Sequence, residues 1–199
     1  MIQRVICLWL FLFCIANATA QNGDSPPKPR IQFCSKNEFG VSMGMGTIKG
    51  MDDFDYRNKE SVLELSSSNG IRYGRLFVGA GIGVRKWGND YLLPLFFTSS
   101  LNLWNGKNSL FLHLDVGNQF GNRKPNFFGD KETGNFFIAY GLGYDFSVTE
   151  HMKLYLKASV SHQHAKALGP YSGLGPYQGL ESYDLKYLFF KISVGVRIN

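Results

Sequence analysis

Ser161, His162, His164 and Glu181 come closest to a catalytic set in this chain. A serine hydrolase needs a serine hydrogen-bonded to a histidine, and that histidine hydrogen-bonded to a carboxylate. Apolar and polar residues alternate around Ser161 as in a β-strand, so the adjacent Ser161 and His162 would point to opposite faces. His162 and His164 would share a face, but two histidines without a third ligand make a weak metal site. We predict no catalytic residue, no metal site and no cofactor.

A second set of polar residues recurs at alternate positions inside otherwise apolar segments. It comprises Glu64, Arg85, His113, Asp115, Asp145, Lys157, Lys191 and Arg197. An unpaired buried charge is costly, and this set contains both signs, so we expect these side chains to pair inside the fold. A path for protons or ions is the alternative interpretation.

The segments that carry these residues alternate with a period of two. There are eight: 39–46, 61–68, 76–85, 95–104, 110–117, 136–146, 154–161 and 190–198. One face of each is apolar, and the other holds mainly Gly, Ser, Ala and the charges. The surface of a soluble sandwich does not need small residues, whereas the crowded lumen of a narrow barrel does. We predict an all-β fold, an eight-stranded antiparallel up-and-down transmembrane β-barrel with its apolar face in lipid.

The connections between the segments support this arrangement. Short joints are expected at Asn69 to Gly74, Asn105 to Asn108 and Ser147 to His151, and mostly longer ones at Lys49 to Glu60, Trp87 to Leu92, Gly121 to Gly134 and Ala165 to Asp184. Asn69-Gly70 and Asn105-Gly106 are hairpin signals. Short periplasmic turns and long external loops are typical of outer-membrane barrels. Both termini are then expected in the periplasm.

The N-terminal region reads as an export signal followed by a leader. Arg4, the apolar run from Val5 to Ile15 and Ala18-Thr19-Ala20 predict a signal peptide over residues 1–20 that is cleaved before Gln21. The Pro-rich stretch 21–36 predicts an extended periplasmic leader, and 37–199 is left for the barrel. Cleavage leaves Cys34 as the one cysteine, expected as a free thiol near the first strand.

One internal repeat lies in the last predicted loop. Leu168-Gly169-Pro170-Tyr171-Ser172-Gly173 is followed by Leu174-Gly175-Pro176-Tyr177-Gln178-Gly179. Tyr171 and Tyr177 would present rigid aromatic rings to a protein or glycan, or fold back over the mouth of the barrel.

The glycine-rich strand patterns resemble a known family. Gly79-Ala80-Gly81-Ile82-Gly83-Val84, Leu114-Asp115-Val116-Gly117 and Tyr140-Gly141-Leu142-Gly143-Tyr144 are similar to the PorT-like "outer membrane protein beta-barrel domain". The resemblance covers about residues 37 to 199. It implies an integral outer-membrane protein inserted by the barrel-assembly machinery. The chain departs from many such barrels by ending in Arg197-Ile198-Asn199 rather than in an aromatic residue.

These observations favour a barrel with a structural, surface-interaction or secretion-accessory role. Its expected partners are outer-membrane lipid and lipopolysaccharide, the assembly machinery, and an envelope or secretion protein. The formal net charge is +6, but the basic residues are scattered and form no nucleic-acid motif, so no nucleic-acid partner is expected. The alternatives are a lipid A-modifying enzyme at the barrel rim and a secreted, soluble, lipocalin-like binding barrel.

Overall fold

The computed structural model describes residues 31–49, 56–104, 106–124, 131–170 and 180–199. Its eight long strands are β1 (Ile31–Lys49), β3 (Ser61–Tyr73), β4 (Leu76–Trp87), β5 (Asp90–Asn102), β6 (Ser109–Phe120), β8 (Lys131–Ser147), β9 (Met152–Pro170) and β10 (Leu180–Ile198). Two further strands have two residues each, β2 (Tyr56–Arg57) and β7 (Asn122–Arg123). Over these residues, no helix has the length and apolar character needed to cross a membrane.

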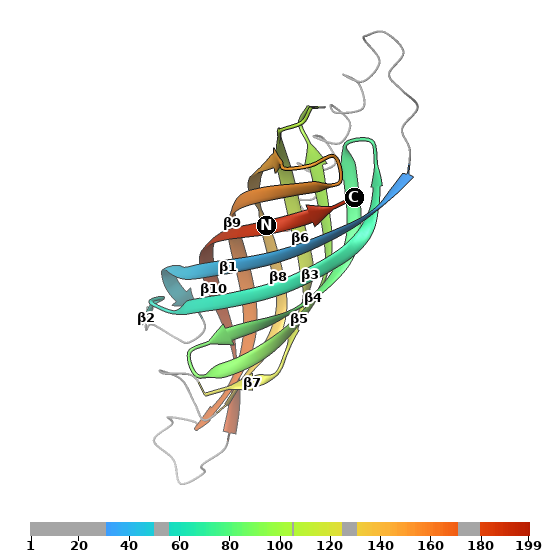
Figure 1. Ribbon diagram of the computed structural model, residues 1–199. Helices are drawn as coiled ribbons and strands as arrows, with labels where there is room; N and C mark the ends of the chain where they lie inside the picture. The colour runs from blue at the N-terminus through green and yellow to red at the C-terminus, as the bar shows by residue number, and fades with distance from the viewer. Residues whose placement is uncertain (1–30, 50–55, 105, 125–130, 171–179) are drawn as a thin grey trace. The chain divides into compact units, whose positions relative to one another are not determined.

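The long strands form a closed ring. Each pairs antiparallel with its neighbour in the order β1-β3-β4-β5-β6-β8-β9-β10, and β10 pairs with β1 (Figure 1). The predicted eight-stranded antiparallel up-and-down barrel is confirmed.

The strands are staggered around the ring. A row of directly paired residues leaves Ser35 on β1, crosses all eight strands and returns to β1 at Met45. With ~3.3 Å per residue and ~4.8 Å between strands, this stagger corresponds to a tilt of roughly 40° from the barrel axis. Such a narrow, tilted barrel has an interior that side chains can fill.

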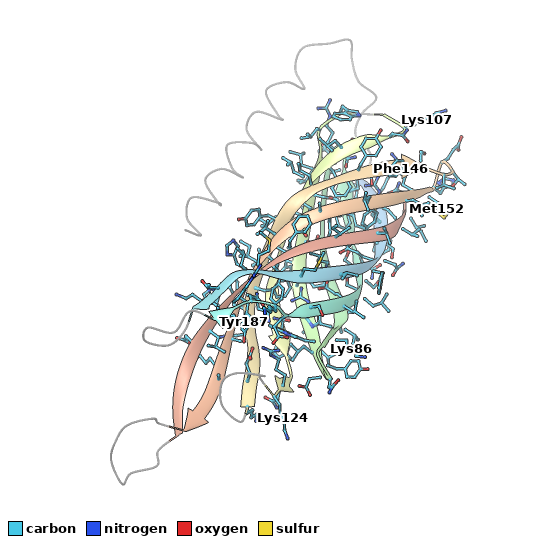
Figure 2. All side chains as sticks on the ribbon, turned by 90° about the vertical axis from the view of Figure 1, so that its left-hand side faces the viewer. Lys86, Lys107, Lys124, Phe146, Met152 and Tyr187 are labelled. Atoms are coloured by element: carbon cyan, nitrogen blue, oxygen red, sulfur yellow. The ribbon has the colours of Figure 1, made fainter. Side chains whose placement is uncertain are left out.

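One end of the barrel, the turn end, holds three short connections together with Ile31 and Asn199, the first and last described residues. Its turns lie at 74–75, at 103–104 with 106–108, and at 148–151. The other, the loop end, holds β2, β7, the end of β9 at Pro170 and the start of β10 at Leu180. Figure 2 shows the separation, with Lys107, Phe146 and Met152 toward one end and Lys86 and Lys124 toward the other.

Several predicted boundaries are wrong. The barrel begins at Ile31 rather than at residue 37, because residues 31–36 of the expected leader pair with β3. Asn69-Gly70 lies inside β3, and the chain turns instead at Gly74, whose φ of 58° suits glycine. At Gly70 itself a side chain would collide with the backbone of Val78, so this glycine permits close strand approach.

The loop end also differs from the prediction. The joint after Trp87 is a two-residue turn, Gly88-Asn89, with Gly88 at a φ of 63°. The expected loop from Ala165 to Asp184 is mostly strand, because β9 continues to Pro170 and β10 starts at Leu180. The expected loop from Gly121 to Gly134 contains β7 and the start of β8. The predicted signal peptide and residues 21–30 of the leader lie outside the described residues.

The two faces of the barrel have the predicted character. Phe97 on β5 is 75% exposed and Leu65 on β3 is 62% exposed, whereas Phe77 on β4 points inward and is fully buried. The outward side chains of all eight strands form an apolar belt around the barrel. Among its exposed members are Met43, Leu63, Val78, Ile82, Leu95, Leu142, Leu156 and Ile192.

An apolar core fills the loop-end part of the barrel. Trp87 stands edge-on to Tyr187 and to Phe189, with ring centroids 5.0 and 5.2 Å away. Buried residues from five strands complete this core, including Ile48, Val62, Leu92, Ala165 and Leu185. The core closes the loop end with packed side chains.

Candidate functional site: the charged lumen

The structure places every member of the predicted polar set inside the barrel. Glu64, Arg85, His113, Asp115, Asp145, Lys157, Lys191 and Arg197 are all buried. Each lies on the inward face of its strand because the side-chain direction alternates along the chain. They come from six strands, β3, β4, β6, β8, β9 and β10.

Six of the charged residues form one continuous chain across the lumen, which we call the central chain. It runs through Asp115, Lys157, Glu38, Lys191, Glu64 and Arg85. Acidic and basic side chains alternate along it, with three of each. The positive and negative charges of the central chain therefore balance.

The contacts along the central chain are short where Lys157 and Lys191 meet glutamates. Lys157 Nζ lies 2.7 Å from Glu38 Oε2 and 3.4 Å from Asp115 Oδ2. Lys191 Nζ lies 3.0 Å from Glu38 Oε1 and 2.8 Å from Glu64 Oε1. Arg85 completes the chain by donating from Nε to Glu64 Oε2. Each lysine thus joins two carboxylates, so removing one lysine disturbs two ion pairs.

A small cavity lies beside the central chain. Its volume is about 20 Å³, which is roughly the space of one water molecule. The His113 ring lines it, and neither ring nitrogen has a hydrogen-bond partner in the described residues. Lys36 lines it too, with Nζ donating to Ser100 Oγ at 2.8 Å and 3.9 Å from the Phe77 ring centroid. The space suits a bound water rather than a passing solute.

A second polar cluster lies toward the turn end. Asp145 Oδ2 is 2.8 Å from Arg197 Nη1 and accepts from Asn102 Nδ2 at 3.1 Å. Arg72 Nη2 donates to Asn102 Oδ1 at 2.6 Å. Cys34 is a buried free thiol in this single chain, and its Sγ donates to Asn199 Oδ1 at 2.7 Å. This contact ties the first strand to the C-terminal residue.

A third cluster lies at the loop end, where β7 brings Arg123 into the barrel. Arg123 Nη2 is 2.9 Å from Glu132 Oε2 and 2.9 Å from Tyr187 Oη, which itself donates to Glu132. The guanidinium lies 3.8 Å from the Trp87 ring centroid, and Trp87 Nε1 donates to Glu60 Oε2 at 3.1 Å. Arg123 thereby anchors the connection between β6 and β8 to the barrel wall.

The histidine and serine considered for catalysis do not meet. Ser161 is buried in the lumen, whereas His162 points outward, stacks on Tyr140 at a centroid distance of 5.9 Å and has Nε2 3.2 Å from its hydroxyl. His164 faces Phe136. Glu181 lies in β10 rather than in a loop, because the hairpin extends beyond the predicted strands. Within the described residues, no group of three or more His, Cys, Asp and Glu side chains could hold a metal ion.

Sequence reasoning missed Lys36, Glu38, Arg72 and Arg123, of which only Glu38 belongs to the central chain. Lys36 and Glu38 precede the predicted first strand, although Ile31 and Phe33 already alternate with polar residues there. Arg72 falls in the predicted turn, and Arg123 in a predicted loop. The remaining predicted site residues, Tyr171 and Tyr177, lie outside the described residues, and Leu168–Pro170 of the repeat pair with β10.

Comparison with known proteins identifies the fold only. The chain is similar to the crystal structure of Neisserial surface protein A (NspA), with a TM-score of 0.52 and 12% sequence identity over 85% of this chain and 98% of that one. This likeness supports a small outer-membrane barrel fold. No family model matches the chain, and no curated protein does. The PorT-like resemblance therefore stays a prediction.

Proposed function

We propose that the chain is an integral outer-membrane β-barrel that works without catalysis, in a structural, surface-interaction or secretion-accessory role. The observation that carries this proposal is the apolar belt on all eight strands. Soluble monomers rarely expose contiguous apolar patches larger than a few hundred Å². In a bilayer the same side chains contact the lipid acyl chains and need not be buried against protein. The shared fold with NspA, a surface protein by name, supports the same environment.

The filled lumen argues against transport. Ion pairs cross it in the middle, and aromatic side chains pack it at the loop end. A permeating ion would have to separate these buried ion pairs. Each charged side chain would then lose its partner without gaining water in its place, which is costly. The protein would then act through its surface, with the loop end as the side that reaches the outside.

The partners follow from this placement. Phospholipid and lipopolysaccharide surround the belt, and the barrel-assembly machinery inserts the chain. Lys86, Lys166 and Lys186 point outward near the loop end and are exposed, where they would meet lipopolysaccharide phosphates. An envelope or secretion protein would bind the loop end. The PorT-like resemblance supports this class of partner, and both termini would lie in the periplasm.

Fractionation and gel migration test the membrane assignment. The full chain, expressed in a Gram-negative host, is expected in the outer-membrane fraction and to migrate differently in a gel before and after boiling. Recovery as a soluble, folded monomer without detergent would instead support the lipocalin-like alternative. Planar bilayer recordings of the refolded barrel are expected to show no steady conductance, and a reproducible single-channel step would contradict the closed lumen.

The surface role has its own test. Tyr171→Ala/Tyr177→Ala leaves the β9–β10 pairing intact, since these tyrosines lie between Pro170 and Leu180. Cross-linked partners recovered from intact outer membranes are expected to be lost in this variant and retained in Tyr73→Ala, which changes an exposed tyrosine at the turn end. Identical partners with both variants would remove the tyrosines from the proposal.

A further inference from the structure

Four polar side chains interrupt the apolar belt on β1 and β3. Ser35 pairs with Asn69 and Asn37 with Ser67 across the two strands, and all four point outward. We call this group the polar island. Asn37 and Asn69 are exposed, and Ser35 and Ser67 are half-buried.

The island lies within the belt rather than at its edge. Toward the turn end, the same two strands continue outward with Phe33 and Ile71, which are 67% and 54% exposed. Toward the loop end they continue with Phe39 and Leu65, which are also exposed. Large apolar side chains therefore enclose the island along both strands, so the proposed membrane placement puts it in hydrocarbon.

The island lacks partners inside the barrel wall. Within the described part of the chain, the side-chain amides of Asn37 and Asn69 make no hydrogen bond. Hydrocarbon offers no donor or acceptor, and a polar group without one there is costly. Between transmembrane helices, Asn and Ser side chains are known to hydrogen-bond across to the neighbouring helix.

We propose that the polar island is the centre of a two-fold interface between two copies of this chain in the membrane. Each asparagine amide and each serine hydroxyl carries both a donor and an acceptor. A patch of such groups is complementary to itself, which is the requirement of an isologous two-fold contact. The polar island of a second copy can therefore supply the hydrogen-bond partners that these four side chains lack.

The flanks of the island fit this symmetry. On the β10 side lies a groove of about 470 Å³, whose lining includes Phe39, Leu65, Leu154, Val194 and Val196. On the β4 side, Ile82 and Phe97 protrude, and Phe97 is the most exposed apolar side chain of the described barrel. A two-fold axis through the island sets the groove side of one copy against the protruding side of the other.

This inference rests on the proposed membrane placement, and sedimentation in detergent micelles tests it on the full mature chain. Wild type is expected to dimerise reversibly. Asn37→Leu/Asn69→Leu is expected to raise the dimer dissociation constant roughly tenfold or more, because it removes up to four interchain hydrogen bonds. The matched control is Asn118→Leu, which removes an exposed outward asparagine from β6, across the ring, and should leave the constant unchanged.

Disulfide cross-linking in phosphatidylethanolamine–phosphatidylglycerol vesicles gives a second readout. In a Cys34→Ser background, Asn37→Cys is expected to form several times more covalent dimer than Leu114→Cys, which faces outward on the opposite side of the ring. The difference should persist as the protein is diluted in lipid. Equal cross-linking at the two positions would overturn the interface.

The outcomes separate this inference from the membrane assignment. A heat-modifiable barrel that stays monomeric, or whose dimer is unaffected by Asn37→Leu/Asn69→Leu, overturns the interface alone and leaves the membrane protein in place. It would mean that lipid, water or another protein meets the island. A chain that is soluble without detergent overturns both.

Discussion

Lys191 joins two carboxylates inside the barrel, and its replacement by methionine tests whether the central chain stabilises the fold. Methionine has a similar length and no charge. The variant leaves Glu38 with Lys157 and Glu64 with Arg85, so the central chain changes from three charges of each sign to an excess of one negative charge. Lys191 is 4% exposed, so water cannot readily replace the lost ammonium group.

The expected loss in the free energy of unfolding is about 3 kcal/mol. Removing one partner of a buried ion pair typically costs about 3–5 kcal/mol, and the lower value applies here because each glutamate keeps another cation. Reversible urea unfolding of the barrel in lipid vesicles, followed by tryptophan fluorescence, measures this change. The control is Lys86→Met on the outward face of β4, which is expected to change the same free energy by less than about 0.5 kcal/mol.

A double variant separates charge balance from packing. Lys191→Met/Glu64→Gln restores equal numbers of charges in the central chain, so its destabilisation should be smaller than the sum of the two single effects by about 1 kcal/mol or more. Additive effects, or a Lys191→Met loss no larger than that of Lys86→Met, would refute the view that the lumen is held by mutually dependent ion pairs.

Three other variants test separate parts of the structure. Gly141→Ala places a methyl group against the carbonyl oxygen of Ala158, so urea unfolding should show a loss of about 1–3 kcal/mol; an unchanged midpoint would mean that β8 and β9 lie farther apart. Phe97→Lys puts a charge into the belt and is expected to cost up to about 2–4 kcal/mol in lipid, whereas a neutral result would place Phe97 in water. Arg123→Met leaves Glu132 without its cation and should speed proteinase K cleavage between β7 and β8 in the folded barrel; an unchanged cleavage rate would show that Arg123 does not anchor β7.

The sequence predicted the faces of the barrel better than its boundaries. The period of two follows from backbone geometry, so Leu95, Phe97 and their neighbours could be assigned to one face without further information. Strand ends depend on pairing partners instead. Residues 31–36 read as a continuation of the Pro-rich leader, but they extend β1 because β3 continues to Tyr73 and offers a free edge.

The candidate site was predicted as a set of residues but not as a network. Alternation placed Lys157, Lys191 and Glu64 in the lumen, yet Glu38, the common partner of the two lysines, preceded the expected strand. The contact of Arg123 with Trp87 joins β7, which lies in a predicted loop, to β4, which is distant in sequence, and no local pattern encodes it. Local periodicity predicts whether a side chain points into the lumen or outward, whereas the side chains that it meets across the barrel depend on strand register.

The central claim is that the apolar belt contacts lipid. Nuclear Overhauser effects in lipid nanodiscs measure this contact directly. Methyl groups of Ile82, Leu95 and Leu142 are expected to show cross-peaks to the acyl chains. Those of Thr98 and Ala139, which are buried on the inward face, should show none. Acyl cross-peaks absent from the outward methyl groups, or as strong at Thr98 and Ala139, would contradict the account.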